Sequence, residues 1–252
     1  GFDPEEVLFR SLYLNGIEDF SIACADTLTQ PAFLDGSQLR KFDIVLANPP
    51  YSIKQWNREA FANDKWGRNF LGTPPQGRAD YAFIQHILAS MNPDTGRCAV
   101  LLPHGILFRK EEQEIRKNLI EKDLIEAVIG LGPNAPMEAC VLVCRNRKPA
   151  NLKNKIIFIN AVKEVTRKNA ESYLEPTHIE KIVSAYVSSN DIADFKRIVT
   201  NNEVADNDFD LSIQKYVFLN DYEATHIDIE SAISEWKVIF KTNLLNISYY
   251  DI

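Results

Sequence analysis

An apolar stretch that leads directly into Asn48-Pro49-Pro50-Tyr51 is the feature that most constrains how this sequence can fold. Residues 42–47 read Phe-Asp-Ile-Val-Leu-Ala, and apolar runs rich in β-branched and aromatic residues are typical of a buried strand. Pro49 and Pro50 have no N–H to donate to a neighbouring strand, so the strand has to end before them. The sequence therefore predicts a core strand whose carboxyl end carries a rigid polar turn.

Further apolar runs alternate with helix-like segments along the first part of the chain. Short strands are expected at residues 21–25, 98–102, 125–129, 139–144 and 156–159. Helices are expected at residues 4–15, which end at an Asn-Gly stop signal, at 79–91 and at 111–121. The alternation predicts an α/β fold with a mostly parallel sheet, covered by helices on both faces. No helix separates the third and fourth of these strands, so we expect them to form an antiparallel hairpin at the sheet edge.

The pattern changes after about residue 162. We therefore expect an α/β core over residues 1–162 and a smaller, mainly helical region over residues 163–252. Residues 176–186 begin with Pro-Thr and have the apolar spacing of an amphipathic helix. Residues 189–225 are polar and predict irregular structure, and residues 226–246 have the length for one or two further helices.

Composition restricts the classes of function. The net charge of −7 argues against tight duplex binding by the whole surface, because phosphate contacts need a basic face. A local basic cleft, or a partner that grips DNA, remains compatible with this charge. The four cysteines show no metal-binding spacing, so we expect reduced thiols in a cytoplasmic protein and no metal site. Apolar runs are too short for a membrane span, and the first residues do not resemble a signal peptide.

The turn at Asn48–Tyr51 has the groups needed to activate an amino group. In an open α/β sheet, ligands bind beyond the carboxyl ends of the strands. There, the Asn48 amide oxygen and the Pro49 carbonyl supply two acceptors, and Pro50 fixes the backbone. Two acceptors favour a localised lone pair on an exocyclic amine and stabilise the positive charge that develops during methyl transfer. Tyr51 supplies a flat face on which an extruded base can stack. The alternative is a plain Asn-Pro turn, but the whole string directly after a buried strand favours the functional interpretation.

These residues resemble the amino-methyltransferases that use S-adenosylmethionine, and specifically the modification subunit of type I restriction-modification systems. Local patterns along most of the chain, to about residue 235, support the narrower resemblance. They include Asp26-Thr27-Leu28, Gly77-Arg78-Ala79-Asp80-Tyr81-Ala82-Phe83, the segment from Gly96 to Gly105, and Lys215-Tyr216-Val217.

The resemblance implies a Rossmann-like methyltransferase sheet, S-adenosylmethionine as cofactor, and transfer of its methyl group to adenine N6 in DNA. It places Asp3 at the cofactor ribose, Asp26 at the cofactor adenine, and Asn48 beside the reacting groups of both cofactor and base. Each acid has a structural alternative, since Asp3 can cap a helix and Asp26 can cap the turn that follows it. The resemblance also implies a specificity subunit and a restriction subunit as partners.

The sequence departs from the family at two places. The Gly-containing cofactor loop and the helical domain that precede the ribose acid in the family have no counterpart before Asp3. We therefore expect a fragment that is inactive by itself. Residues 130–137 form a shorter loop than is usual in the family.

Two further features leave alternatives open. Basic and aromatic residues are interleaved over residues 51–80, which is compatible with a wall that meets DNA or with a lid that packs its own aromatic side chains. His86 and His104 lie in apolar settings without ligand spacing, and we interpret both as structural.

The function also has alternatives. Protein glutamine methyltransferases share the Asn-Pro-Pro-Tyr turn, a cytosine-N4 enzyme is a variant of the main hypothesis, and a non-catalytic assembly remnant is the third alternative.

Overall fold

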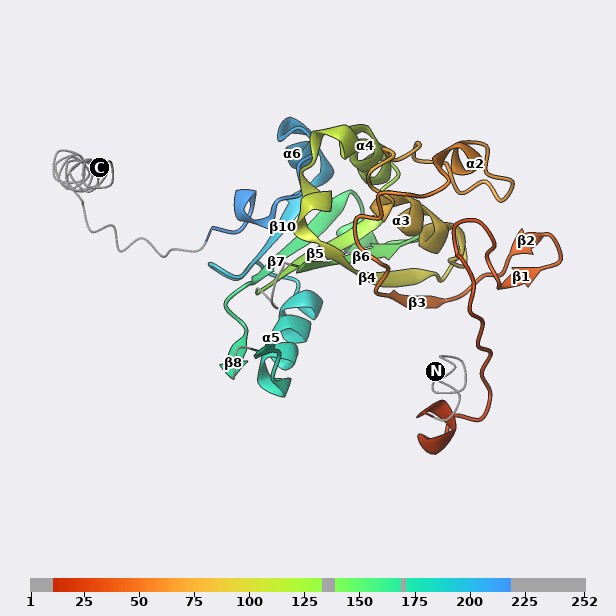
Figure 1. Cartoon of the computed structure of the whole chain (residues 1–252). Helices are drawn as coiled ribbons and strands as arrows, with labels where there is room; N and C mark the ends of the chain where they lie inside the picture. The colour runs from red at the N-terminus through yellow and green to blue at the C-terminus, as the bar shows by residue number, and fades with distance from the viewer. Residues whose placement is uncertain (1–10, 133–138, 169–170, 219–252) are drawn as a thin grey trace, which may run out of the picture. The chain divides into compact units, whose positions relative to one another are not determined.

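The computed structural model describes residues 11–132, 139–168 and 171–218, and its centre is a sheet of six strands in the order β10-β7-β5-β6-β4-β3 (Figure 1). The strands are β3 (Ile44–Ala47), β4 (Arg97–Pro103), β5 (Ile125–Leu131), β6 (Ala139–Arg145), β7 (Lys155–Ala161) and β10 (Lys196–Thr200). Five of these strands fall where the sequence predicts them, because each carries its own apolar run.

Most strands of the sheet run in the same direction. β3, β4, β5 and β7 run the same way, whereas β6 and β10 run in the opposite direction. The predicted α/β class and the β5–β6 hairpin are therefore confirmed, with Gly130 opposite Cys140. The predicted position of the hairpin at the sheet edge is wrong, because β6 lies between β5 and β4. A strand that is apolar on both faces, as β6 is, gains most from an interior position.

Helices cover both faces of the sheet. α3 (Asp80–Ala89), α4 (Gln113–Glu121) and α6 (Asn201–Asp206) lie on one face, and α5 (Pro176–Val187) lies on the other (Figure 1). The spacing of Tyr81, Ile84 and Leu88 puts all three on the buried side of α3, within the larger core cluster. Ile182 and Ala185 of α5 belong to a second cluster on the opposite face.

Short elements complete the described residues. They are the hairpins β1 (Leu34–Asp35) with β2 (Gln38–Leu39) and β8 (Thr166–Lys168) with β9 (Glu171–Tyr173), helix α2 (Arg58–Ala62), and the 3-10 turns η1 (His104–Leu107), η2 (Lys110–Glu112), η3 (Ala150–Leu152) and η4 (Ile213–Lys215). Residues 11–14 are helical, and the helix is followed by the predicted Asn15-Gly16 turn. The φ of Gly16 is 74°, as is common for a glycine that ends a helix. Within the ranges described, no helix has the length and apolar content to cross a bilayer.

Two other predictions of local structure are wrong. Residues 21–25 form no strand in the described structure, because a short apolar run is stable as a strand only when it joins a sheet. Residues 189–225 are not irregular throughout, since β10 pairs antiparallel with β7 and α6 follows it directly. Val199 of β10 is buried in the larger core cluster and Ile198 packs against the second cluster, so both faces of this short edge strand are anchored. The sheet thus crosses the predicted boundary at residue 162, and the division there stays a prediction. Residues 226–246 lie outside the described residues.

Candidate active site

The Asn48–Tyr51 turn lies at the carboxyl edge of the sheet, as predicted. β3 and β4 are parallel, with Ala47 opposite Val100, so the turn leaves the sheet beside the last residues of β4. β4 then passes directly into η1. The turn after β3 and the turn after β4 consequently border the same part of the sheet edge, which is where α/β folds bind ligands.

Asn48 and Tyr51, two of the predicted catalytic residues, contact each other. The Tyr51 hydroxyl donates a hydrogen bond of 2.8 Å to the Asn48 Oδ1 atom. Burial raises the pKa of the Tyr51 phenol, and the nearby Cys140 thiol adds a smaller increase, so the hydroxyl keeps its proton. Pro49 and Pro50 form the backbone between the two side chains. The amide oxygen expected to receive a substrate amino group is therefore presented at the surface, with a tyrosine as its partner.

Asp80 was not predicted as a site residue, yet it contacts the residue that follows Tyr51. Its Oδ1 atom accepts a 2.7 Å hydrogen bond from the Ser52 backbone N–H. Its Oδ2 atom forms a 2.9 Å ion pair with Arg109 Nη1. In the sequence, Asp80 belonged only to a pattern at the start of a helix. The one available signal was an acid at the first position of a helix that faces the core.

The turn after β4 is held by a buried polar network. Tyr81 Oη donates to the Ile106 carbonyl at 2.9 Å, and Arg116 Nη1 donates to the Arg109 carbonyl at 2.7 Å. The Arg109 guanidinium packs so closely on Gly105 that a Cβ there would lie 2.4 Å from its Nη2 atom. Any side chain at this position would have to displace the Arg109 guanidinium from Gly105. Glu112 is fully buried in the same network, and burial raises the pKa of its carboxyl to about 7 even though Arg109 opposes the shift.

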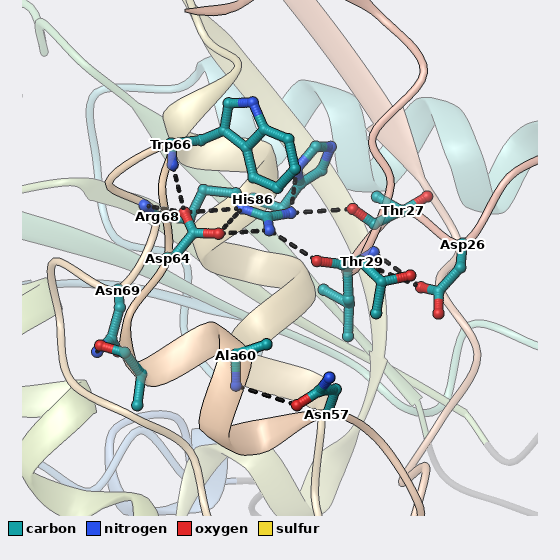
Figure 2. A network of polar contacts seen from close by, with 12 residues as sticks. Asp26, Thr27, Thr29, Asn57, Ala60, Asp64, Trp66, Arg68, Asn69 and His86 are labelled. Carbon is teal, nitrogen blue, oxygen red and sulfur yellow. Dashed lines mark hydrogen bonds and ion pairs between the residues drawn. The ribbon is translucent and has the colours of Figure 1, made fainter. Parts of the chain in front are cut away.

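Asp26, predicted to contact the cofactor adenine, is exposed and caps its own turn. Its Oδ1 atom accepts from the Leu28 backbone N–H at 3.0 Å and from the Thr29 backbone N–H at 3.3 Å (Figure 2). This is the structural alternative noted for the residue, and it leaves the carboxylate accessible from solvent. The cofactor role of Asp26 stays a prediction. Asp3 lies outside the described residues.

Arg68 ties the segment 51–80 to the Asp26 turn (Figure 2). It is fully buried, pairs with Asp64 at 2.6 Å, and donates to the carbonyls of Thr27 and Leu28 at 2.9 and 2.7 Å. Burial alone would raise the pKa of the Asp64 carboxyl, but the Arg68 hydrogen bonds outweigh it and lower that pKa. Burial and Arg68 lower the pKa of His86 to about 4, so the neutral ring accepts at Nδ1 from Arg68. Arg68 is thus a structural residue and does not face a phosphate.

Other polar side chains of segment 51–80 form hydrogen bonds within the segment. Trp56 Nε1 donates to the Gln76 carbonyl at 2.8 Å, and Arg58 Nε donates to the Pro74 carbonyl at 2.8 Å. This arrangement favours the lid over the DNA wall, although four basic residues of the segment remain exposed: Lys54, Arg58, Lys65 and Arg78. A cavity of about 560 Å³ separates the α2 end of this lid from Leu28 and Thr29. In the part of the chain that the structure covers, no three His, Cys, Asp or Glu side chains are grouped to hold a metal ion.

The sheet and its Asn-Pro-Pro-Tyr turn define a protein with a methyltransferase fold. The chain belongs to the N-6 DNA methylase family, whose sequence model matches residues 10–225. It is 33% identical over 250 residues to the type I restriction enzyme MjaVII methylase subunit of Methanocaldococcus jannaschii, covering 92% of this chain and 41% of that protein. It is 32% identical over 224 residues to the MpnII methylase subunit of Mycoplasma pneumoniae, covering 84% and 40%.

A solved structure agrees with this relationship. The crystal structure of the type I restriction-modification system methyltransferase subunit from Streptococcus thermophilus superposes with a TM-score of 0.69 at 35% identity. The match covers 77% of this chain and 41% of that one. The chain therefore spans about two fifths of the length of these relatives.

Proposed function

We propose that this chain carries the catalytic turn of a DNA adenine-N6 methyltransferase, the modification subunit of a type I restriction-modification system. The observation that carries the proposal is the Asn48–Tyr51 turn at the carboxyl edge of β3, with the Asn48 oxygen presented beside an aromatic ring. The family match supports the same chemistry.

In the proposed reaction, the turn activates the amino group of a flipped adenine. Asn48 Oδ1 and the Pro49 carbonyl would accept its two hydrogens, so that the nitrogen lone pair becomes localised and available for methylation. The same two acceptors stabilise the positive charge on the nitrogen until a proton leaves. Tyr51 stacks on the base. The Asn48 oxygen has two lone pairs, so it can accept from the amino group as well as from the Tyr51 hydroxyl.

S-adenosylmethionine supplies the electrophilic methyl group when it is bound. The exposed Asp26 carboxylate fits its proposed role, because an accessible acceptor is what an adenine amino group requires. Asp3 would hold the ribose hydroxyls. We further propose that the chain is inactive without the remainder of its parent protein.

The proposed assembly explains how an acidic chain can act on DNA. With a net charge of −7, the chain has little general attraction for phosphates, so a specificity subunit would read and grip the duplex. A restriction subunit would complete the cytoplasmic system. Under this proposal the recognition sequence resides in another chain.

A methyl-transfer assay tests the proposal. In the full-length protein with its specificity subunit, Asn48→Ala combined with Tyr51→Ala should abolish tritium transfer from labelled S-adenosylmethionine to unmodified DNA. Tyr51→Phe should retain most of the activity, because the ring that stacks is kept. Asn190→Ala with Tyr173→Ala, two exposed positions away from the turn, is the matched control. Adenine methylation by the first double variant would overturn the assignment. Micromolar binding of S-adenosylmethionine to the 252-residue chain in calorimetry would contradict its inactivity.

A further inference from the structure

We propose that Asp80 is a positioning residue for the Asn48–Tyr51 turn, acting through the Ser52 backbone N–H and held in place by Arg109. The inference rests on the proposed methyl transfer at that turn. It adds a residue that contacts neither substrate nor cofactor, but that sets the geometry of the residues that would.

The backbone at Ser52 needs an external partner. Its φ is 50°, in the left-handed region that residues other than glycine rarely adopt. Ser52 follows Tyr51 directly, so a change in this torsion angle moves the turn relative to the lid. The Asp80 Oδ1 atom holds the Ser52 N–H at 2.7 Å and so selects this conformation. Hydrogen bonds to a charged acceptor are among the stronger ones in proteins.

Asp80 is itself rigidly placed. Only 1% of its surface is exposed, and the next turn of α3 buries Tyr81 and Ile84 in the main core. Its second oxygen binds Arg109, which packs on Gly105 in the turn after β4. The Asp80 carboxylate therefore joins the two turns that border the site, one through a backbone N–H and the other through a guanidinium.

The contacts of Asp80 point to the site and not to its own helix. The N-cap residue of α3 is Ala79, which makes no side-chain capping bond, and the Asp80 carboxylate instead accepts hydrogen bonds from Ser52 and Arg109. Burying a carboxylate and a guanidinium costs desolvation energy that an apolar pair would avoid. A geometric role at the turn accounts for charges at this position.

The chain offers a closely matched control in Asp123. Its Oδ2 atom accepts from the Asn154 backbone N–H at 3.0 Å, and its Oδ1 atom pairs with the buried Lys148 at 2.5 Å. Asp123 precedes β5, at the edge of the sheet opposite the Asn48–Tyr51 turn. Asp123 shares with Asp80 a backbone N–H and a cation as partners, and additionally accepts from Asn201 Nδ2 at 3.1 Å, but it lacks the proposed connection to the site.

The experiment compares Asp80→Asn with Asp123→Asn in the full-length protein bound to its specificity subunit. In Asp80→Asn, the side-chain oxygen can accept a hydrogen bond from Ser52 or from Arg109, but the amide NH2 then faces the remaining donor. We expect kcat for tritium transfer to unmodified DNA to fall about tenfold to a hundredfold, because a small misplacement of reacting groups is enough for such a loss. The KM for DNA should stay within about twofold, since binding is not affected. Asp123→Asn should leave both constants unchanged.

A second substitution separates positioning from a general structural role. Ser52→Gly permits a positive φ without strain, so adding it to Asp80→Asn should recover part of the lost kcat. Arg109→Lys, which keeps the charge but loses the planar fork, serves if Asp80→Asn does not fold, and should also lower kcat alone. Equal kcat values for the two asparagine variants, a loss confined to KM, or no recovery with Ser52→Gly would overturn the inference. A wild-type complex that fails to methylate DNA would instead contradict the proposed function.

Discussion

Glu112 is a fully buried carboxyl group whose charge the surrounding residues only partly compensate. Burial raises its pKa from 4.5 to about 7, while Arg109 and Arg116 pull the value down and Asp80 pushes it up. The native state therefore holds the Glu112 proton more tightly than the unfolded chain does. By linkage, the stability contributed by the protonated group is complete below the unfolded pKa and is lost as the pH rises through 7.

Glu112→Gln should consequently stabilise the protein at alkaline pH. A shift of this size corresponds to a difference on the order of 3 kcal/mol between the charged and neutral forms. We expect the variant to exceed the wild type in free energy of unfolding by up to that amount at pH 8, and to match it near pH 4. Urea unfolding at the two pH values measures the difference. A stability difference that does not change with pH would show that ionisation of Glu112 is not its cause.

At the scale of elements, the sequence predicts what each segment encodes by itself. The strands at 98–102, 125–129, 139–144 and 156–159 are predicted by their apolar runs and the helix at 79–91 by its apolar spacing, and all are present. What could not be predicted depends on distant partners. β10 has only two apolar residues and is a strand because β7 lies beside it, and β6 takes an interior place because both of its faces are covered. The Asn48–Tyr51 turn is local and was predicted, whereas the Asp80–Ser52 contact spans 28 residues and was not.

The lid formed by segment 51–80 depends on Arg68. Its planar fork binds Asp64 and two carbonyls at once, which a lysine cannot reproduce. We expect Arg68→Lys to open the lid, with amide hydrogen exchange faster over residues 57–69 and unchanged in β5 and β7. The loss in stability should be about 3–5 kcal/mol at most, the usual cost of breaking a buried ion pair.

Lys65→Ala provides the contrast for Arg68→Lys. Lys65 is exposed and lies 4.2 Å from the Trp66 ring, where a cation contributes at most about 1 kcal/mol. Exchange in the lid should therefore remain close to that of the wild type. Equally fast exchange in the two variants would mean that general electrostatics, and not the Arg68 fork, closes the lid.

At the scale of the whole molecule, the described sheet ends at β3 with an apolar edge. Ile44 is 56% exposed and Leu46 is 78% exposed, and among the described residues no strand pairs with the outer side of β3. An open strand edge with exposed apolar side chains is a template for association between chains. The net charge of −7 opposes such association through repulsion, which salt screens.

These opposing effects predict that the 252-residue chain self-associates more strongly as salt is added. Leu46→Lys should suppress this association, because a lysine on an edge strand blocks edge-to-edge pairing. Val187→Lys is the control, since Val187 is also largely exposed but lies on α5, where no strand edge is available. Sedimentation velocity at low and high salt measures the oligomer fraction for each variant. If both lysine substitutions reduce association equally, the added charge and not the β3 edge governs self-association, and the exposed strand edge is not the surface through which the chains associate.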